Sequence, residues 1–160
     1  MAKNELVLLI EGDPDLADVV GIRVREAGYR VRTARRAVDG VCAAIEFQPQ
    51  VILLGDCSQH VRTDVATTNS ALIEHAQANH IPVLLLGSAS YEQAIGTFGR
   101  VPTPLEGTVL TDLVTKAMEF AAFVELSRDR MLARMDTRHQ PFVKHTAPAP
   151  VTEDRGVNDG

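Results

Sequence analysis

The segment VLLIEGD, residues 7–13, decides the fold, because four consecutive apolar residues run directly into an acid, a glycine and a second acid. An apolar run closed by turn-forming residues is typical of a strand that is buried on both faces of a parallel sheet. Three later segments end in comparable turns: VILLGDC at 51–57, VLLLGSA at 83–89 and RVPTPL at 100–105. We therefore expect four strand ends at one edge of a sheet, where parallel sheets build their binding sites.

Helices are predicted between these strands. Asp13 and Pro14 suit the cap and the first turn of a helix that ends near Ala27, before Gly28. Residues 29–33 alternate between apolar and basic side chains, as in a strand near the edge of a sheet. Further helices are expected at 37–47, 64–78 and 91–95 and from about residue 108 onward.

The helix at 37–47 shows which side chains should face the core. Its larger apolar residues are expected to point inward: Val38, Val41, Cys42 and Ile45. Cys42 is accordingly interpreted as a small buried hydrophobe, whereas Cys57, at a strand end, is a candidate for an accessible thiol. The two cysteines lack the spacing of metal ligands, and no disulfide is expected between them.

The alternation of strands and helices with short connections defines the fold class. It predicts an α/β protein with a flavodoxin-like, doubly wound, five-stranded parallel sheet. We expect this domain to span 1–124, with 125–135 extending the last helix. Residues 136–160 contain three prolines and few large apolar side chains, so a disordered tail is expected there.

Charge and hydropathy exclude several function classes. The net charge of −5 gives no electrostatic basis for nucleic-acid binding, and no DNA-binding motif accompanies the basic cluster at 30–36. The first apolar run is too short for a signal peptide or a membrane span, so we expect a cytoplasmic protein without membrane partners. The histidines have no second ligand at metal-binding spacing, and no metal site is predicted from them.

Five segments in a specific order resemble the receiver domain of bacterial response regulators: VLLIEGDPDL at 7–16, EAGY at 26–29, PQVILL at 49–54, IPVLLL at 81–86 and PTPL at 102–105. The resemblance covers about residues 5–124. It implies transfer of a phosphoryl group from a histidine kinase to an aspartate at the end of the third strand. It further implies Mg²⁺ held by acids after the first strand, a hydroxyl after the fourth strand and a lysine after the fifth.

The first and third strand ends depart from that pattern. Glu11 keeps one acid on a longer side chain, but Gly12 stands where the second acid belongs. Gly55 stands at the position of the acceptor aspartate, and Asp56 follows one position later. The acceptor site is thus expected to be degenerate.

The fourth and fifth strand ends depart as well. Gly87 takes the place of the hydroxyl residue, with Ser88 next to it. Thr103 takes the place of the lysine, and Arg100 stands where the family usually has an aromatic side chain. The resemblance implies a lysine whose positive charge offsets the negative charge of the transferring phosphoryl group. Thr103 does not supply this charge.

A shift by one residue would restore part of the pocket. Asp13, Asp56 and Ser88 each stand one place beyond the expected site, which makes Asp56 the candidate phosphoacceptor and Glu11, Asp13 and Asp56 the alternative Mg²⁺ ligands. Adjacent residues of an extended chain point to opposite faces, so such a shift normally disables a site. Without the shift, Asp13 is interpreted as a helix cap, and Glu11 as a solvated rim residue.

The surface that receivers present to partners is also altered. Gly87 and Thr103 are only 16 positions apart, which leaves room for a shortened fourth helix. The last helix should cover the sheet with an apolar face and show a second apolar face through Phe120 and Phe123, continued by Met131. Together with Arg100 these residues are predicted to form a surface for a signalling protein or for a second copy of this chain.

These observations predict a stand-alone, atypical receiver that acts as a phosphorylation-independent interaction module, without enzymatic activity and without a cofactor. The first alternative is an active receiver that accepts a phosphoryl group on Asp56 with a modified Mg²⁺ site. The second alternative is a domain that binds a small ligand or nucleotide at the glycine-lined strand ends, where Gly12, Gly55 and Gly87 would admit it.

Overall fold

The computed structural model describes residues 4–57, 65–87, 97–102 and 106–145. Contacts divide the chain into two units, Met1–Val124 and Glu125–Gly160. The first unit contains all the described strands, and the account of the sheet below concerns this unit.

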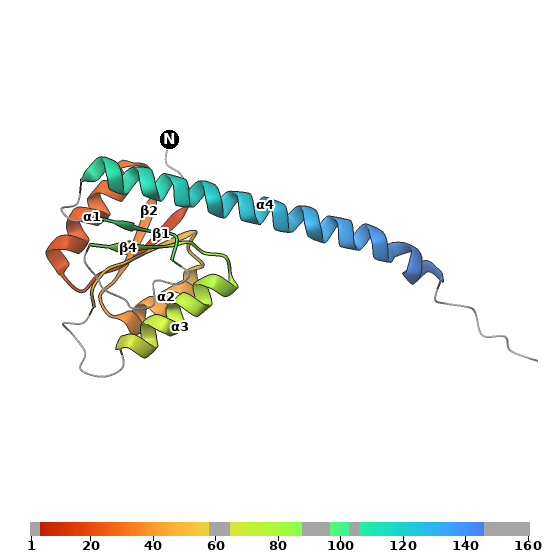
Figure 1. Ribbon diagram of the computed structural model, residues 1–160, viewed down its shortest axis with the longest axis horizontal. Coiled ribbons are helices and arrows are strands. Elements are labelled where there is room, and N and C mark those ends of the chain that lie inside the picture. Colours follow the sequence, from red (N-terminus) through yellow and green to blue (C-terminus); the bar gives the residue numbers. More distant parts are fainter. Residues whose placement is uncertain (1–3, 58–64, 88–96, 103–105, 146–160) are drawn as a thin grey trace, which may run out of the picture. The chain divides into compact units, whose positions relative to one another are not determined.

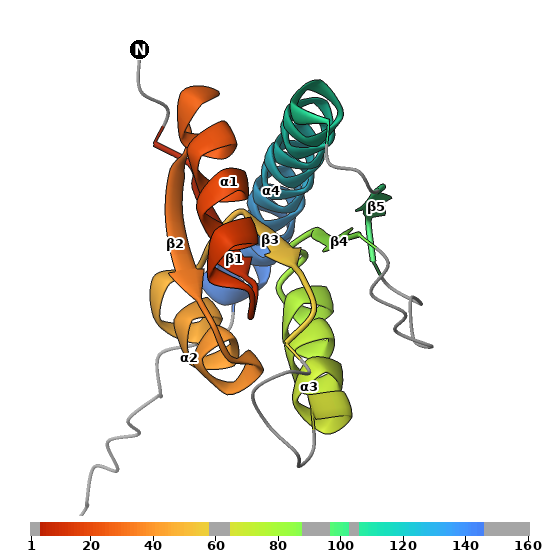
Figure 2. The ribbon, with the colours of Figure 1, turned by 90° about the vertical axis from the view of Figure 1, so that its left-hand side faces the viewer.

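Five strands form one parallel sheet, and their order along the chain differs from their order in space. They are β1 (Leu6–Ile10), β2 (Arg30–Ala34), β3 (Val51–Leu54), β4 (Val83–Leu86) and β5 (Gly99–Val101). The order in space is β2-β1-β3-β4-β5, with every neighbouring pair parallel (Figure 2). The predicted doubly wound, flavodoxin-like sheet is therefore confirmed, and β2 is an edge strand as its alternating sequence indicated.

Helices cover both faces of this sheet. They are α1 (Pro14–Glu26), α2 (Ala37–Phe47), α3 (Val65–Ala78) and α4 (Gly107–His145) (Figure 1). The views place α1 and the beginning of α4 on one face, and α2 and α3 on the other (Figure 2). α1 ends as predicted, because Gly28 follows it with a φ of 99°, a left-handed conformation that glycine adopts without strain.

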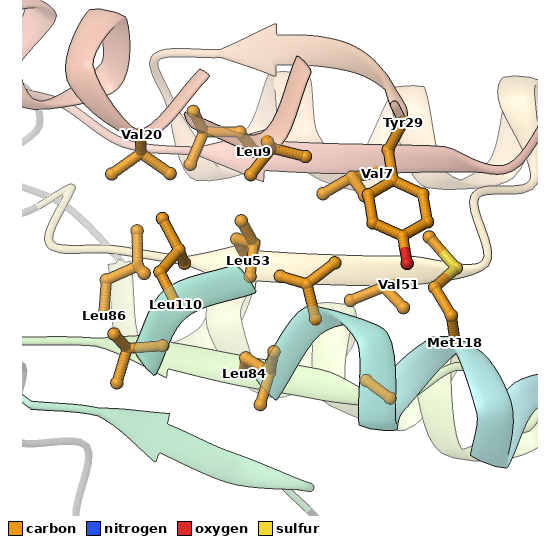
Figure 3. Close-up of a cluster of buried hydrophobic side chains, with 14 of the residues drawn as sticks. Val7, Leu9, Val20, Tyr29, Val51, Leu53, Leu84, Leu86, Leu110 and Met118 are labelled. Carbon is orange, nitrogen blue, oxygen red and sulfur yellow. The ribbon is translucent and has the colours of Figure 1, made fainter. Parts of the chain in front are cut away.

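The core between the sheet, α1 and α4 is apolar throughout. Side chains of β1, β3 and β4 meet those of the two helices there, among them Leu9, Leu53 and Leu110 (Figure 3). Tyr29 lies at one end of this core, and its hydroxyl is 3.2 Å from the hydroxyl of Thr115 on α4. The apolar face with which the last helix was expected to cover the sheet is present at its beginning, where Leu110, Val114 and Ala117 are buried.

On the other face of the sheet, the core shows that the predicted orientation of α2 was largely wrong. Val38 and Ile45 are half exposed and Cys42 is exposed, whereas the small residues Ala37, Gly40 and Ala44 are buried. The cause is close packing of α2 on β1, since a β-carbon built on Gly40 would overlap the side chain of Ile10. This close approach buries the small residues of α2 and leaves Val38, Cys42 and Ile45 outside, whereas Val41 is partly buried against the core as expected.

The assignment of the two cysteines was therefore wrong for both. Cys42 is exposed, because it lies on the outer face of α2. Cys57 is buried in the core between the sheet, α2 and α3.

The last helix is longer than expected. α4 ends at His145, ten residues past Met135, so residues 136–145 are helical and the expected tail does not begin at 136. Pro141 lacks one amide hydrogen, but the polar residues before it are compatible with a helix. Residues 146–160 and the predicted shortened helix near 91–95 lie outside the described residues. Within the described part of the chain, no helix is both long and apolar enough to span a membrane.

Candidate functional site

The candidate site is built where β1 and β3 end side by side. Ile10 is paired with Leu54, so the next residues, Glu11 and Gly55, stand at the same level of the sheet. The amide of Gly55 donates to the carbonyl of Ile10 at 2.7 Å, and the amide of Glu11 donates to the carbonyl of Ala34 at 3.0 Å. Backbone hydrogen bonds to both neighbouring strands thus fix the position of Glu11.

The side chain of Glu11 is buried, with only 3% of the residue exposed. Its carboxylate accepts hydrogen bonds from the backbone amides of Asp13, at 3.2 Å from Oε1, and of Asp56. These bonds hold an acid that would otherwise lose its hydration without compensation. The interpretation of Glu11 as a solvated rim residue is therefore wrong.

The carboxyl group of Glu11 also accounts for the glycine on the neighbouring strand. A β-carbon built on Gly55 would overlap Oε2 of Glu11. The space in which a side chain at residue 55 would begin is therefore already filled by a carboxylate from β1. A long acid level with a glycine on the adjacent strand is the sequence signal that could have predicted this arrangement.

The pKa of Glu11 is raised above its ordinary value of 4.5, chiefly because burial disfavours the charged form. The hydrogen bond from the amide of Asp13 opposes this effect, and the negative charges of Asp13 and Asp56 add to it. The site therefore concentrates negative charge around one buried acid, with no cation from the described residues acting on its pKa.

Asp13 caps α1. Its Oδ1 accepts hydrogen bonds from the amides of Asp15, at 2.9 Å, and Leu16, at 3.5 Å. The predicted helix cap is confirmed, and it engages Oδ1 of the carboxylate that a one-residue shift would assign to a metal ion.

Asp56 is exposed, unlike the residues on either side of it. Its backbone carbonyl accepts a hydrogen bond from the amide of Gly12 at 3.2 Å, which ties the loop after β1 to the loop after β3. The described residues contain no group of three His, Cys, Asp or Glu side chains that could hold a metal ion. With Glu11 bonded to backbone amides and Asp13 to its helix, these residues do not fit a Mg²⁺ site.

The ends of β4 and β5 are joined through Gly87. Its amide donates to the carbonyl of Val101 at 2.9 Å, and its carbonyl accepts from Nη1 of Arg100 at 2.7 Å. Gly87 has a φ of 67°, a conformation that glycine adopts without strain. Arg100 is thus bonded to Gly87, the residue that stands where the resemblance implies a hydroxyl side chain. Ser88 and Thr103 lie outside the described residues.

Cys57 borders the same region from inside the core. Its Sγ lies 4.0 Å from the carbonyl oxygen of Gly55. Burial raises the pKa of its thiol to about 11, and the charges of Glu11 and Asp56 contribute. A neutral, inaccessible thiol is a core residue and not a nucleophile.

The predicted partner surface begins with an aromatic pair. The rings of Phe98, which precedes β5, and Phe120 of α4 are 5.4 Å apart between centroids. Phe120 remains 44% exposed and Phe123 67% exposed, so the second apolar face of the helix is open to solvent. Further along α4, in the second unit, Met131 is exposed as well.

Comparisons with known proteins agree with this fold. No family model matches the chain. A curated relative, the DNA-binding dual master transcriptional regulator RpaA of Synechocystis, is 28% identical over 142 residues, which is 88% of this chain. The chain spans 54% of that protein's length, about half.

Solved receiver structures match about three quarters of this chain. The signal receiver domain of a putative LuxO repressor protein from Vibrio parahaemolyticus has a TM-score of 0.63 at 18% identity, covering 78% of this chain and 98% of that one. The chemotaxis protein CheY4 of Vibrio cholerae has a TM-score of 0.60 at 18% identity, covering 72% and 99%. The fold of the chain is therefore the receiver fold.

Proposed function

We propose that the chain is an atypical response-regulator receiver that signals by binding a protein partner without being phosphorylated on an aspartate. One observation carries this proposal: the carboxyl group of Glu11 fills the space in which a side chain at residue 55 would begin. In this proposal the receiver fold is retained, and the carboxyl group of Glu11 occupies the position at which the side chain of a phosphoacceptor would begin.

Electrostatics supports the loss of phosphoryl transfer. Proteins catalyse this transfer mainly by positioning and by placing cations where negative charge develops. Here a buried carboxylate replaces the acceptor, Asp13 is bonded to its helix, and Thr103 stands in the sequence at the position of the lysine. Among the described residues, an incoming phosphoryl donor would therefore meet negative charge at Glu11 with no cation acting on that carboxyl group.

The partner surface is proposed to include Arg100, Phe120 and Phe123, continued by Met131. The aromatic side chains there are large, exposed and adjacent to β5, and aromatic residues supply much of the binding energy at protein interfaces. The proposed partner is a signalling protein; self-association through α4 is the second candidate, and light scattering of the full chain separates the two.

Phosphodonor labelling tests the proposal. The full chain is incubated with acetyl phosphate and Mg²⁺, and its intact mass is measured beside that of an active receiver. We expect no added phosphoryl group. A gain that disappears in Asp56→Asn would replace the proposal with the active-receiver alternative. The second alternative, a ligand among the strand-end glycines, meets a filled space at Gly55.

A further inference from the structure

An open surface pocket of about 620 Å³ lies at the edge of the sheet, between β2 and α2. Its polar lining consists of Arg32, Thr33, Arg35, Arg36 and Asp39, and its apolar lining includes the ring of Phe47. We call it the basic cavity. A volume of this size is in the range of small-molecule sites.

The charges of the lining favour an anion. Three arginines face one aspartate in a chain whose net charge is −5. Arg36 is paired with Asp39, with 2.8 Å between Nε and Oδ2 and 3.2 Å between Nη2 and Oδ1. In the part of the chain that the structure describes, no ion pair is found for Arg35 or Arg32, so two guanidinium groups retain an uncompensated charge.

The helix that borders the cavity adds to this field. α2 begins at Ala37, and the side chain of its N-cap residue Arg36 does not cap the amides of the first turn but bonds to the Asp39 carboxylate within that turn. The amides of that turn and the positive end of the helix dipole therefore reinforce the arginines.

The aromatic part of the lining points to a ligand with a flat ring. The guanidinium carbon of Arg32 lies 3.7 Å from the centroid of the Phe47 ring, so the two planar groups form a cation–π pair. A guanidinium group over an aromatic ring offers a stacking surface for a base, as in proteins that bind unpaired nucleotides. A phosphate on the arginines and a base on this pair would use both parts of the cavity.

We propose that the basic cavity binds a nucleotide, with its phosphate groups on Arg35 and Arg36 and its base near Arg32 and Phe47. A small ligand is favoured over a nucleic acid because the net charge of −5 repels a long polyanion, while a small anion experiences mainly the local field. This inference is independent of the proposed function, because none of Glu11, Asp13, Gly55 and Asp56 lines the cavity; Ala34, which does, meets Glu11 through its backbone carbonyl.

Calorimetry on the full chain tests the inference with ADP, GDP, AMP and pyrophosphate at low and moderate ionic strength. We expect binding of a nucleoside diphosphate that is at least about tenfold tighter than binding of pyrophosphate, and that weakens with salt. Arg35→Glu should weaken it by at least about tenfold. Arg25→Glu, the same charge change on the exposed face of α1, is the matched control and should alter it less than about twofold.

A second variant, Phe47→Leu, removes the aromatic ring and keeps the arginines of the lining. We expect it to weaken nucleotide binding more than pyrophosphate binding, so that the preference for the nucleotide falls. The inference is overturned if no nucleotide binds at millimolar concentration, or if Arg35→Glu and Arg25→Glu behave alike. Equal affinity for pyrophosphate and nucleotide, or tighter binding of a single-stranded oligonucleotide than of a mononucleotide, would also overturn it.

Discussion

The carboxyl group of Glu11 lies where the side chain of residue 55 would begin, and residue 55 is a glycine. The two positions are level on neighbouring strands, so a change at one directly constrains the other. In a receiver fold this is the level of the phosphoacceptor. The proposed function rests on the presence of this carboxylate where the side chain of a phosphoacceptor would begin.

Stability should depend on pH through Glu11. Its pKa is raised in the folded protein, so the folded state binds this proton more tightly than the unfolded state does. The stabilisation is complete below the ordinary pKa of 4.5 and is lost as the pH rises through the folded value. Denaturant unfolding of the wild type and Glu11→Gln should show the wild type losing stability relative to the variant above pH 4.5. A difference that does not change with pH would contradict this account.

Asp13 should act as a helix cap. Asp13→Ala removes the acceptor for two amides of α1 and should lower the free energy of unfolding by about 0.5–2 kcal/mol. Asp13→Ser keeps a capping oxygen without the charge and should retain most of the stability. If Asp13→Ser were as unstable as Asp13→Ala, the carboxylate charge would matter more than the cap.

The two cysteines should differ strongly in reactivity. Cys42 is exposed, and Cys57 is buried with a pKa of about 11. A thiol reagent such as dithionitrobenzoate at pH 8 should therefore label one cysteine quickly, and the second only after unfolding. Cys42→Ser should abolish the fast phase, and a fast phase that survives in this variant would show that Cys57 is accessible.

Much of the fold could be predicted because its signals are local. Apolar runs closed by glycine or proline located the strands, and Asp13 with Pro14 located the start of α1. The orientation of α2 could not be predicted in the same way. Its apolar residues lie on more than one face, and only the close approach to Ile10 decides that Gly40 and Ala44 point inward.

The site was predicted by position but not by environment. The sequence pattern placed Glu11 and Gly55 directly after the first and third strands. The pairing of Ile10 with Leu54 sets the two residues level in the sheet. The burial of Glu11 depends on amides contributed by the loops after β1 and β3. No pattern within one segment reveals such a contact between two loops. The exposure of Asp56 beside two buried neighbours was likewise set by the tertiary structure.

The contact between Glu11 and Gly55 can be tested directly by a double-mutant cycle on the free energy of unfolding. Gly55→Ala should lower the stability by about 1–3 kcal/mol, because the added methyl group collides with a buried carboxylate. Gly99→Ala on β5 is the matched control, since its methyl group would meet Leu84 at an ordinary 3.5 Å.

The decisive measurement is the cost of Gly55→Ala in the Glu11→Ala background. We predict that most of the cost disappears there, giving a coupling energy of about 1–3 kcal/mol between the two positions. Equal costs of Gly55→Ala in the two backgrounds would show that Glu11 does not fill the acceptor position, and would contradict the account.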